Sequence, residues 1–285
     1  MSNPLKAIAK LARKFTDISL GIRDIRQDML QLQLLETQRL QSEILSRPRY
    51  QEPKRLVGFG YKIFSQRDED GIINEIFARV GADSKTFLEI GVENGWECNT
   101  TALLYSGWKG SWFEGSSADV ASIKRTFADR ISAGQLSVTQ QFVTRSFCWE
   151  MQERWPALRT IDLLSLDIDG NDYHIIDALP EIRARVLVLE YNAKLRPPIN
   201  WHMPYKSDYV WDGSDYTGVS LTAWVELLQS KGYSLVGCNI AGVNAFFVRS
   251  DLVGDKFAAP FTAENHYEPA RYAMLYSSGH PIQRK

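Results

Sequence analysis

Carboxylate side chains end several predicted buried strands, and they are the first candidates for chemistry. Asp167 and Asp169 close the apolar run IDLLSLDID (161–169). A strand would place both side chains on one face, where two carboxylates repel each other unless a proton or a cation lies between them. The pair therefore predicts either a general base that takes a hydroxyl proton or oxygen ligands for Mg²⁺ that hold a diol.

Three interpretations of this strand end remain open. In the first, Asp167, Asp169 or the imidazole of His202 takes the hydroxyl proton of an acceptor. In the second, Mg²⁺ is bound at the ends of this strand and the next one. In the third, the acids are structural: Asp172 caps the following helix, and one aspartate accepts hydrogen bonds from backbone amides. The ligands of the metal interpretation are Asp169, Glu190 and Asn192.

A glycine-rich turn follows an earlier strand and predicts a cofactor site. The strand TFLEIG (86–91) contains Glu89 and runs into a turn with Gly91 and Gly95, and the next strand ends at Glu114. A dinucleotide-binding turn instead reads GxGxxG and holds pyrophosphate at a helix N-terminus; an acid before the first glycine would repel that group. One acid near an ammonium group and one on ribose hydroxyls suit S-adenosylmethionine better than NAD.

The segment 192–219 is rich in aromatic, acidic and proline residues and joins the fifth predicted strand to a helix. Long loops between elements often carry binding residues. Aromatic rings stack on the C–H faces of a sugar while carboxylates bond its hydroxyls, so one interpretation is an acceptor-binding cover. The other is a lid whose aromatic residues only pack. The candidate acceptor-binding residues are Trp201, Tyr205, Trp211, Asp212, Asp215 and Tyr216.

These strand ends need a sheet that brings them to one edge. Apolar runs alternate with segments of helical spacing, which is typical of a parallel sheet covered on both faces. The last two runs, GYSLVGCN and GVNAFFVRS, are joined by a turn so short that it forces an antiparallel hairpin. We expect an α/β fold, a Rossmann-like doubly wound seven-stranded sheet with this C-terminal hairpin. The earlier strands are expected at 86–91, 110–115, 136–143, 161–169 and 184–191, and helices at 68–80, 97–106, 116–131, 171–179 and 220–231.

From about residue 60 to 250 the sequence resembles class I S-adenosylmethionine-dependent methyltransferases, in particular FkbM-type and related glycan O-methyltransferases. Glu93 departs from the commonest pattern, because it stands where a middle glycine is usual. The matching segments are FSQRDEDGIINEIF, FLEIGVENGWECNT, WFEGS, IDLLSLDIDGNDY, VLVLEYN, WDGSDYTG and KGYSLVGCNIAGVNAFFV.

This resemblance implies a role for each strand end. The methionine end of the cofactor would lie on the glycine turn, and the ribose on the acid that ends the second strand. Two residues after the third strand would flank adenine, and the acids of the fourth strand would lie beside the transferred methyl group. The resemblance implies Glu89, Gly91 and Gly95 at the methionine end and Glu114 at the ribose. It implies Phe142 and Val143 at the adenine, and Asp167 and Asp169 beside the transferred methyl group.

The N-terminal part predicts one long amphipathic helix. Asn3 and Pro4 suit a helix start, and apolar residues then recur at alternating steps of three and four, the heptad pattern of a coiled coil. We expect a homo-oligomer through residues 8–32. Packing on the chain's own domain and contact of the basic first turns with an anionic membrane surface remain alternatives. The seam consists of Ile8, Leu11, Phe15, Ile18, Ile22, Ile25, Met29 and Leu32.

The chain divides into four expected parts. They are a helix at 1–45, a linker at 46–58, the methyltransferase-like domain at 59–254, and a tail at 255–285 that packs on the domain or on a neighbour.

Composition limits the function classes that remain. A formal net charge of −1 argues against nucleic acid as a partner, because such binding needs a positive field. The three separated cysteines fit a reducing compartment, and no apolar run approaches the roughly 20 residues that span a bilayer. We therefore expect a cytoplasmic protein, peripheral at the inner face of the membrane if the basic helix docks there.

These observations predict an S-adenosylmethionine-dependent O-methyltransferase. The expected acceptor is a sugar or glycan hydroxyl, in the synthesis of surface polysaccharide, glycolipid or a natural product, and Mg²⁺ is a further cofactor in the metal interpretation. One alternative is a metal-dependent glycosyltransferase that uses Asp167 and Asp169 as a DxD signature. The other is a non-catalytic oligomerising scaffold.

Overall fold

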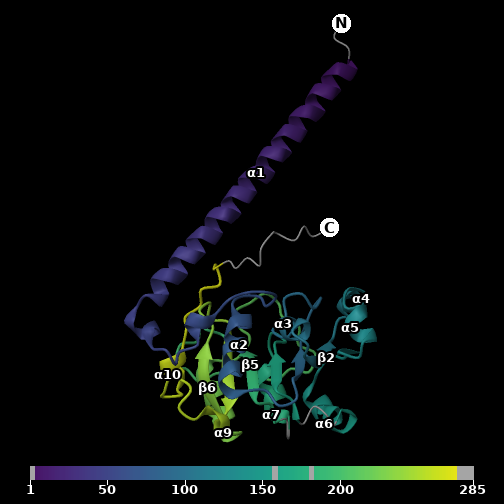
Figure 1. The fold of residues 1–285 in the computed structure, drawn as a ribbon. Helices are drawn as coiled ribbons and strands as arrows, with labels where there is room; N and C mark the ends of the chain where they lie inside the picture. The colour runs from purple at the N-terminus through teal and green to yellow at the C-terminus, as the bar shows by residue number, and fades with distance from the viewer. Residues whose placement is uncertain (1–3, 156–159, 180–182, 275–285) are drawn as a thin grey trace.

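The computed structural model describes residues 4–155, 160–179 and 183–274, with the side chains of the first helix described from residue 21 onward. A sheet with helices on both faces forms the body, and a long helix extends away from it (Figure 1). Among the described residues, no helix combines the length and the apolar character needed to cross a membrane.

Seven strands form one mixed sheet in the order β3-β2-β1-β4-β5-β7-β6. The first five of these positions are parallel, whereas β7 runs antiparallel to both of its neighbours. The chain builds outward from β1 in one direction and then from β4 in the other, so a crevice opens between the ends of these two strands. The strands are β1 (Thr86–Ile90), β2 (Lys109–Glu114), β3 (Leu136–Gln140), β4 (Leu163–Leu166), β5 (Val186–Glu190), β6 (Tyr233–Cys238) and β7 (Asn244–Arg249).

Alternate residues of each strand enter two separate cores, because successive side chains point to opposite faces of a sheet. In β1, for example, Phe87 packs on one face and Leu88 on the other. The first face is covered by α2 (Glu69–Val80), α3 (Thr101–Tyr105), α4 (Ser117–Thr126), α5 (Ala128–Ser132) and α9 (Ser250–Val253). The second face is covered by α6 (Arg145–Arg154), α7 (Asp172–Ala178), α8 (Leu221–Ser230) and α10 (Ala263–His266).

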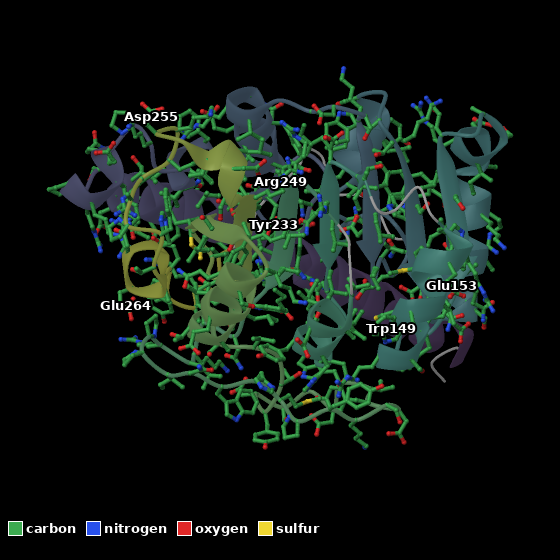
Figure 2. All side chains as sticks on the ribbon, turned by 90° about the horizontal axis from the view of Figure 1, so that it is seen from below. Trp149, Glu153, Tyr233, Arg249, Asp255 and Glu264 are labelled. Carbon is green, nitrogen blue, oxygen red and sulfur yellow. The ribbon has the colours of Figure 1, made fainter. Side chains whose placement is uncertain are left out.

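The structure confirms the expected α/β class, the seven strands and the antiparallel hairpin. The second strand of the hairpin, β7, pairs with β5, so the first strand, β6, lies at the edge of the sheet. Figure 2 shows Tyr233 and Arg249 next to each other in this hairpin, where the register pairs them. Helix α6, which carries Trp149 and Glu153 in the same view, is an element that the apolar pattern did not predict.

Helix α1 (Pro4–Leu45) is continuous, and only its last turns meet the body. Ile44 is buried in a small core with Val57, Ile240 and Met274, and Leu40 packs against the same core. The seam predicted from the sequence ends at Leu32, and Leu40 is the first apolar residue after it that packs on this core. The rest of α1 points away from the sheet (Figure 1).

Residues 46–58, expected to be a linker, lie against the body. They contain the short 3-10 helix η1 (Pro48–Gln51) and begin η2 (Val57–Phe59), and Leu56 is only 1% exposed. The Tyr50 hydroxyl donates a hydrogen bond of 2.9 Å to the buried carboxylate of Glu268, which also pairs with Arg271. These contacts tie the segment to the tail, whose residues up to 274 pack on the body; the remainder of the tail lies outside the described residues.

Candidate active site

A cavity of about 640 Å³ lies over the carboxyl ends of β1, β2, β4 and β5. This is the crevice at which open α/β sheets bind ligands. Its lining brings together residues from the glycine turn, from the loop after β4 and from the segment 192–219. The cavity therefore joins most of the strand ends that the sequence singled out.

The turn after β1 approaches the β4 end so closely that it admits no side chain at Gly91. A Cβ at Gly91 would overlap the carbonyl oxygen of Asp167, and the residue has a φ of 80°. Glu93 adopts a φ of 46°, which is the left-handed region that glycine favours. Its backbone thus follows the course that the usual glycine would take, although its side chain differs.

Gly95 does not line the cavity, contrary to its expected place at the methionine end of a cofactor. A Cβ there would lie 2.8 Å from the rings of both Trp112 and Phe127. The need for glycine at this position therefore comes from aromatic packing behind the turn.

Glu114 lies at the end of β2 with its carboxylate fixed by three backbone groups. Oε2 accepts hydrogen bonds from the N–H groups of Val92 and Glu93 at 3.1 and 2.9 Å. Oε1 accepts one from the N–H group of Ser116 at 2.7 Å. A carboxylate has about four acceptor positions, so Oε1 keeps capacity for a hydroxyl of a ligand in the cavity.

Glu89 is buried at the floor of the cavity, and its two oxygens hold the start of α3. Oε1 accepts from the N–H group of Asn99, while Oε2 accepts from both the N–H and the hydroxyl of Thr100. Burial raises the pKa of Glu89, and the Thr100 hydroxyl is the main contact that acts in the opposite direction. Its present contacts are structural, rather than directed at a ligand ammonium group.

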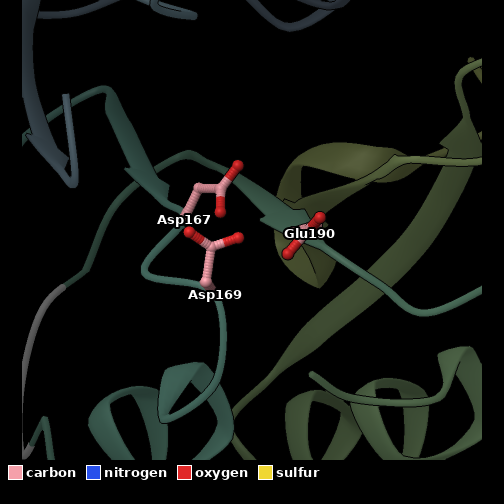
Figure 3. A group of neighbouring side chains, drawn as sticks. All are labelled: Asp167, Asp169 and Glu190. Atoms are coloured by element: carbon pink, nitrogen blue, oxygen red, sulfur yellow. The ribbon is translucent and has the colours of Figure 1, made fainter. Parts of the chain in front are cut away.

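Asp167, Asp169 and Glu190 converge in the other half of the cavity (Figure 3). One carboxylate oxygen from each lies within 4.8 Å of the other two. Burial, followed by the neighbouring carboxylates of Asp172 and Asp169, raises the pKa of Asp167 well above its usual value. Burial and then Asp167 do the same for Glu190, and burial raises the pKa of Asp169. Such a group can hold a proton, receive one, or bind a cation.

The loop after β4 holds Asp169 in an unusual conformation. Asp169 has a φ of 59°, and left-handed non-glycine residues are often associated with functional sites. The buried carboxylate of Asp172 fixes this loop by accepting from the N–H groups of Ile168 and Gly170 at 3.0 and 2.9 Å. Asp172 thus has a structural role, but it holds the preceding loop instead of capping the following helix as one interpretation expected, while Asp169 faces the cavity.

Asn192 does not join the acidic group, although the metal interpretation placed it there. Its Nδ2 donates hydrogen bonds to the carbonyl oxygens of Asp215 and Thr217, and its Oδ1 accepts from the N–H of Lys194. The amide is therefore occupied in shaping the loop. The acids that could bind a cation in the described chain are Asp167, Asp169 and Glu190.

Phe142 and Val143 line the cavity on the side of β3, beside Gly115 and Glu114. Phe142 is 46% exposed, so its ring forms part of the mouth. Both residues therefore line the cavity, and their expected contact with adenine stays a prediction.

His202 lies outside the cavity, contrary to its expected catalytic role. Its ring stacks on Tyr173 at a centroid distance of 3.8 Å, and its Nδ1 lies 3.2 Å from the carbonyl oxygen of Met203. The imidazole is part of an aromatic cluster under the lid.

Of the six predicted acceptor-binding residues, Trp211 alone lines the cavity. Trp201 and Tyr216 contact each other, and Tyr205 carries the guanidinium of Arg145 over its ring. Asp212 accepts from the N–H of Ser214. The remaining residue, Asp215, forms an ion pair with Lys194.

Several lining residues were not predicted as site residues. Tyr209 and Val210 precede Trp211 in a segment that the sequence did single out. Only the course of this loop, which decides which of its side chains face the cavity, was missing from the prediction. Asn244 begins β7 and reaches the cavity because that strand pairs with β5, which no local pattern indicates. Those outside the lid include Gln66, Glu93, Glu97, Asn99, Asn171 and Asn244.

No protein-family model matches the sequence, and no curated protein matches it significantly. Solved structures with a similar chain path include a magnesium protoporphyrin IX methyltransferase from Synechocystis with bound S-adenosylmethionine, at 14% identity and a TM-score of 0.39; the alignment covers 64% of this chain and 78% of that one. An O-methyltransferase from Bacillus cereus in complex with S-adenosylhomocysteine is 12% identical with a TM-score of 0.41, covering 75% and 88%.

A further similar structure is an S-adenosylmethionine-dependent methyltransferase from Clostridium acetobutylicum, at 12% identity and a TM-score of 0.39; it covers 62% of this chain and 88% of that one. At such identities the fold class rests on the topology itself. The helix-flanked sheet with an antiparallel β7 between β5 and β6 is a Rossmann-like methyltransferase fold.

Proposed function

We propose that this chain is an S-adenosylmethionine-dependent O-methyltransferase whose acceptor is a sugar or glycan hydroxyl. The observation that carries the proposal is the fixed carboxylate of Glu114, which shares one cavity with the acids Asp167, Asp169 and Glu190. An acid that could hold the cofactor ribose at one end and groups that could take the hydroxyl proton at the other would serve such a reaction.

The residues of the β1–β2 end fit the cofactor. Glu114 would accept hydrogen bonds from ribose hydroxyls, and the side-chain-free position at Gly91 lets the methionine part approach the backbone. Phe142 and Val143 would contact adenine, and the carboxylate of Asp167 would attract the ammonium group. When bound, S-adenosylmethionine supplies an electrophilic methyl group.

Asp169 is our choice for the base. It is the most exposed of the three acids, and its raised pKa improves its ability to take a proton from a hydroxyl group near neutral pH. Glu190 would hold the acceptor by accepting a hydrogen bond. In the metal variant of the proposal, the same three carboxylates bind Mg²⁺ and loss of activity in a chelator would reveal it.

The lining of the cavity weighs against the glycosyltransferase alternative. Among its described residues are seven carboxylates and no lysine, arginine or histidine. A nucleotide diphosphate would be repelled by such a surface unless metal ions neutralised most of it. A sugar hydroxyl carries no such charge, and the face of Trp211 is available to stack on its ring.

Ligand-dependent stability tests the cofactor. We expect S-adenosylhomocysteine to raise the melting temperature, because a ligand that binds only the folded state stabilises it. A UDP-sugar with Mn²⁺ should have no effect. Glu114→Ala should weaken S-adenosylhomocysteine binding about 10- to 100-fold, because it removes a charged hydrogen-bond acceptor, while Glu153→Ala on exposed α6 should not. Absence of any shift in folded protein would contradict the proposal.

We also propose that α1 joins copies of this chain through residues 8–32. Within the described part of this seam, Ile22, Ile25, Met29 and Leu32 are each 58–65% exposed. Large apolar side chains that recur at heptad spacing on a helix directed away from its own body need a partner surface. A second copy supplies the same surface in register.

Molar mass in solution tests this assembly. The parent chain should have a mass that is a multiple of 32.5 kDa, and Ile25→Glu should reduce it to the single-chain value because a charge would enter the seam. Gln27→Glu adds the same charge outside the seam and should leave the mass unchanged. A monomeric parent that sediments with anionic lipid vesicles would favour the membrane interpretation instead.

A further inference from the structure

Two polar groups in the half of the cavity near Glu190 have no hydrogen-bond partner within the described chain. They are the side-chain carbonyl oxygen Oδ1 of Asn244 and the hydroxyl of Tyr209, and both atoms are buried. Both residues line the cavity. Because an unpaired buried polar group is unfavourable, a ligand that hydrogen-bonds in this half of the cavity would complete both of them.

The orientation of the Asn244 amide is fixed by a buried network. Its Nδ2 donates a hydrogen bond of 2.9 Å to Oε1 of Glu69, and a carboxylate in this role can only accept. Asn239 donates to the same oxygen at 2.9 Å and accepts from the backbone N–H of Asn244 at 2.9 Å. With its NH₂ group held in this way, Asn244 must present its carbonyl oxygen on the other side.

The sheet places this oxygen beside the acidic group. Asn244 is 4% exposed and lies directly opposite Glu190 in the register of β5 and β7. Directly opposed residues on antiparallel strands have neighbouring side chains on one face. Asn244 is therefore a hydrogen-bond acceptor that adjoins other acceptors.

Tyr209 enters from the lid. Its ring packs so closely over the backbone of Gly170 that a Cβ at Gly170 would lie 2.5 Å from it. This packing fixes the ring and leaves the hydroxyl as the adjustable part. The hydroxyl can donate to, or accept from, whatever occupies the cavity.

We infer that this half of the cavity is a recognition site for a neutral or amine-bearing polyhydroxy group, selected by Asn244, Tyr209 and the neighbouring carboxylates. The inference rests on the proposed function and narrows it to acceptors without a phosphate or carboxylate. A group rich in hydrogen-bond donors satisfies Asn244 and the acids together. An anionic substituent cannot itself donate a hydrogen bond to Asn244 and would be repelled by the carboxylates.

A set of matched sugars tests this selection on protein saturated with S-adenosylhomocysteine. The probes are a methyl glucoside, glucosamine, glucuronate and a hexose phosphate, each titrated to millimolar concentration and followed by ligand-observed NMR. We expect the glucoside and glucosamine to bind at least about tenfold more tightly than the two anions. Equal or tighter binding of the anions would overturn the inference, as would a failure of both uncharged and amine probes to bind.

Tyr209→Phe tests the residue assignment without removing any hydrogen bond within the described protein. We expect it to weaken binding of the best probe about three- to tenfold, the value of one hydrogen bond, with the melting temperature unchanged. Tyr105→Phe, at a partly exposed position outside the cavity, should change neither quantity. Asn244→Ala should weaken binding of the same probe. The melting temperature of this variant shows how far the loss of binding comes from disruption of the buried network.

The S-adenosylhomocysteine titration separates the two proposals. Loss of S-adenosylhomocysteine binding in the parent protein would contradict the proposed function itself. Normal binding of S-adenosylhomocysteine, combined with no effect of Tyr209→Phe on the best probe, would overturn only the recognition site.

Discussion

The two ends of the cavity treat their polar groups in opposite ways. At the β1–β2 end, the carboxylate oxygens of Glu89 and Glu114 accept hydrogen bonds from backbone N–H groups. At the β4–β5–β7 end, three carboxylates face one another, and Asn244 has an unpaired oxygen. At the first end, the carboxylates have hydrogen-bond partners within the protein. At the second end, the repulsion between carboxylates and the unpaired oxygen are unfavourable until a ligand or a proton enters. This division is typical of a fixed cofactor site beside a reacting one.

The largest predicted effect concerns activity at the incomplete end. Asp169→Asn should reduce methyl transfer about 100- to 10,000-fold, the usual contribution of a general base, without loss of stability. Asparagine tolerates the left-handed φ of this position, so the loop should keep its course. Transfer of a labelled methyl group to the best glycoside probe measures the effect. Asp208→Asn, an exposed change in the lid, is the control, and equal activity of the two variants would contradict the assignment of the base.

The next effect concerns stability at the complete end. Glu89→Ala should lower the free energy of unfolding by about 3 kcal/mol, because it leaves the N–H groups of Asn99 and Thr100 buried without an acceptor. Urea unfolding measures this loss. Glu93→Ala removes a carboxylate from an exposed site on the same turn and should cost less than about 0.5 kcal/mol. If both variants unfolded at the same urea concentration, the two ends would not differ in the way described.

The smallest effect is a change in the pH dependence of stability. The raised pKa of Glu190 in the folded state means that the stability linked to its protonated form is complete below about pH 4, the ordinary glutamate value, and is lost as the pH rises toward the raised value. Glu190→Gln cannot ionise, so its stability relative to the parent should grow as the pH rises from 5 to 9. Melting temperatures of the parent and of Glu190→Gln across this pH range measure the effect. If the two melting curves ran parallel, ionisation of Glu190 would make no contribution to the pH dependence of stability.

The predictable parts of the site are those that depend on short stretches of chain. The apolar pattern of each strand indicates its end, so Glu114 and Asp167 could be placed at the mouth of the sheet, and Gly91 could be assigned to a close turn. Gly95 followed the same pattern, but its reason is packing against Trp112 and Phe127. A local pattern thus predicts where glycine is needed without indicating which surface requires it.

The parts that escaped prediction depend on pairing between distant segments. Asn244 reaches the cavity because β7 inserts between β5 and β6. The sequence predicts the hairpin, but it does not reveal which of the two hairpin strands pairs with β5. The composition of the lid indicated aromatic residues at the site, but the direction of each ring depends on packing. Trp211 therefore faces the cavity while His202 stacks on Tyr173 beneath the lid.

The contact of Leu56 with the sheet determines where an autonomous folding unit can begin. A Cβ on Gly237 would lie 3.3 Å from the Leu56 side chain, so this glycine in β6 provides a socket that residue 56 fills. A recombinant protein trimmed to start at residue 59 would expose that socket and the apolar wall around it. Expression boundaries for the body should therefore retain Leu56, even where the projecting seam is removed.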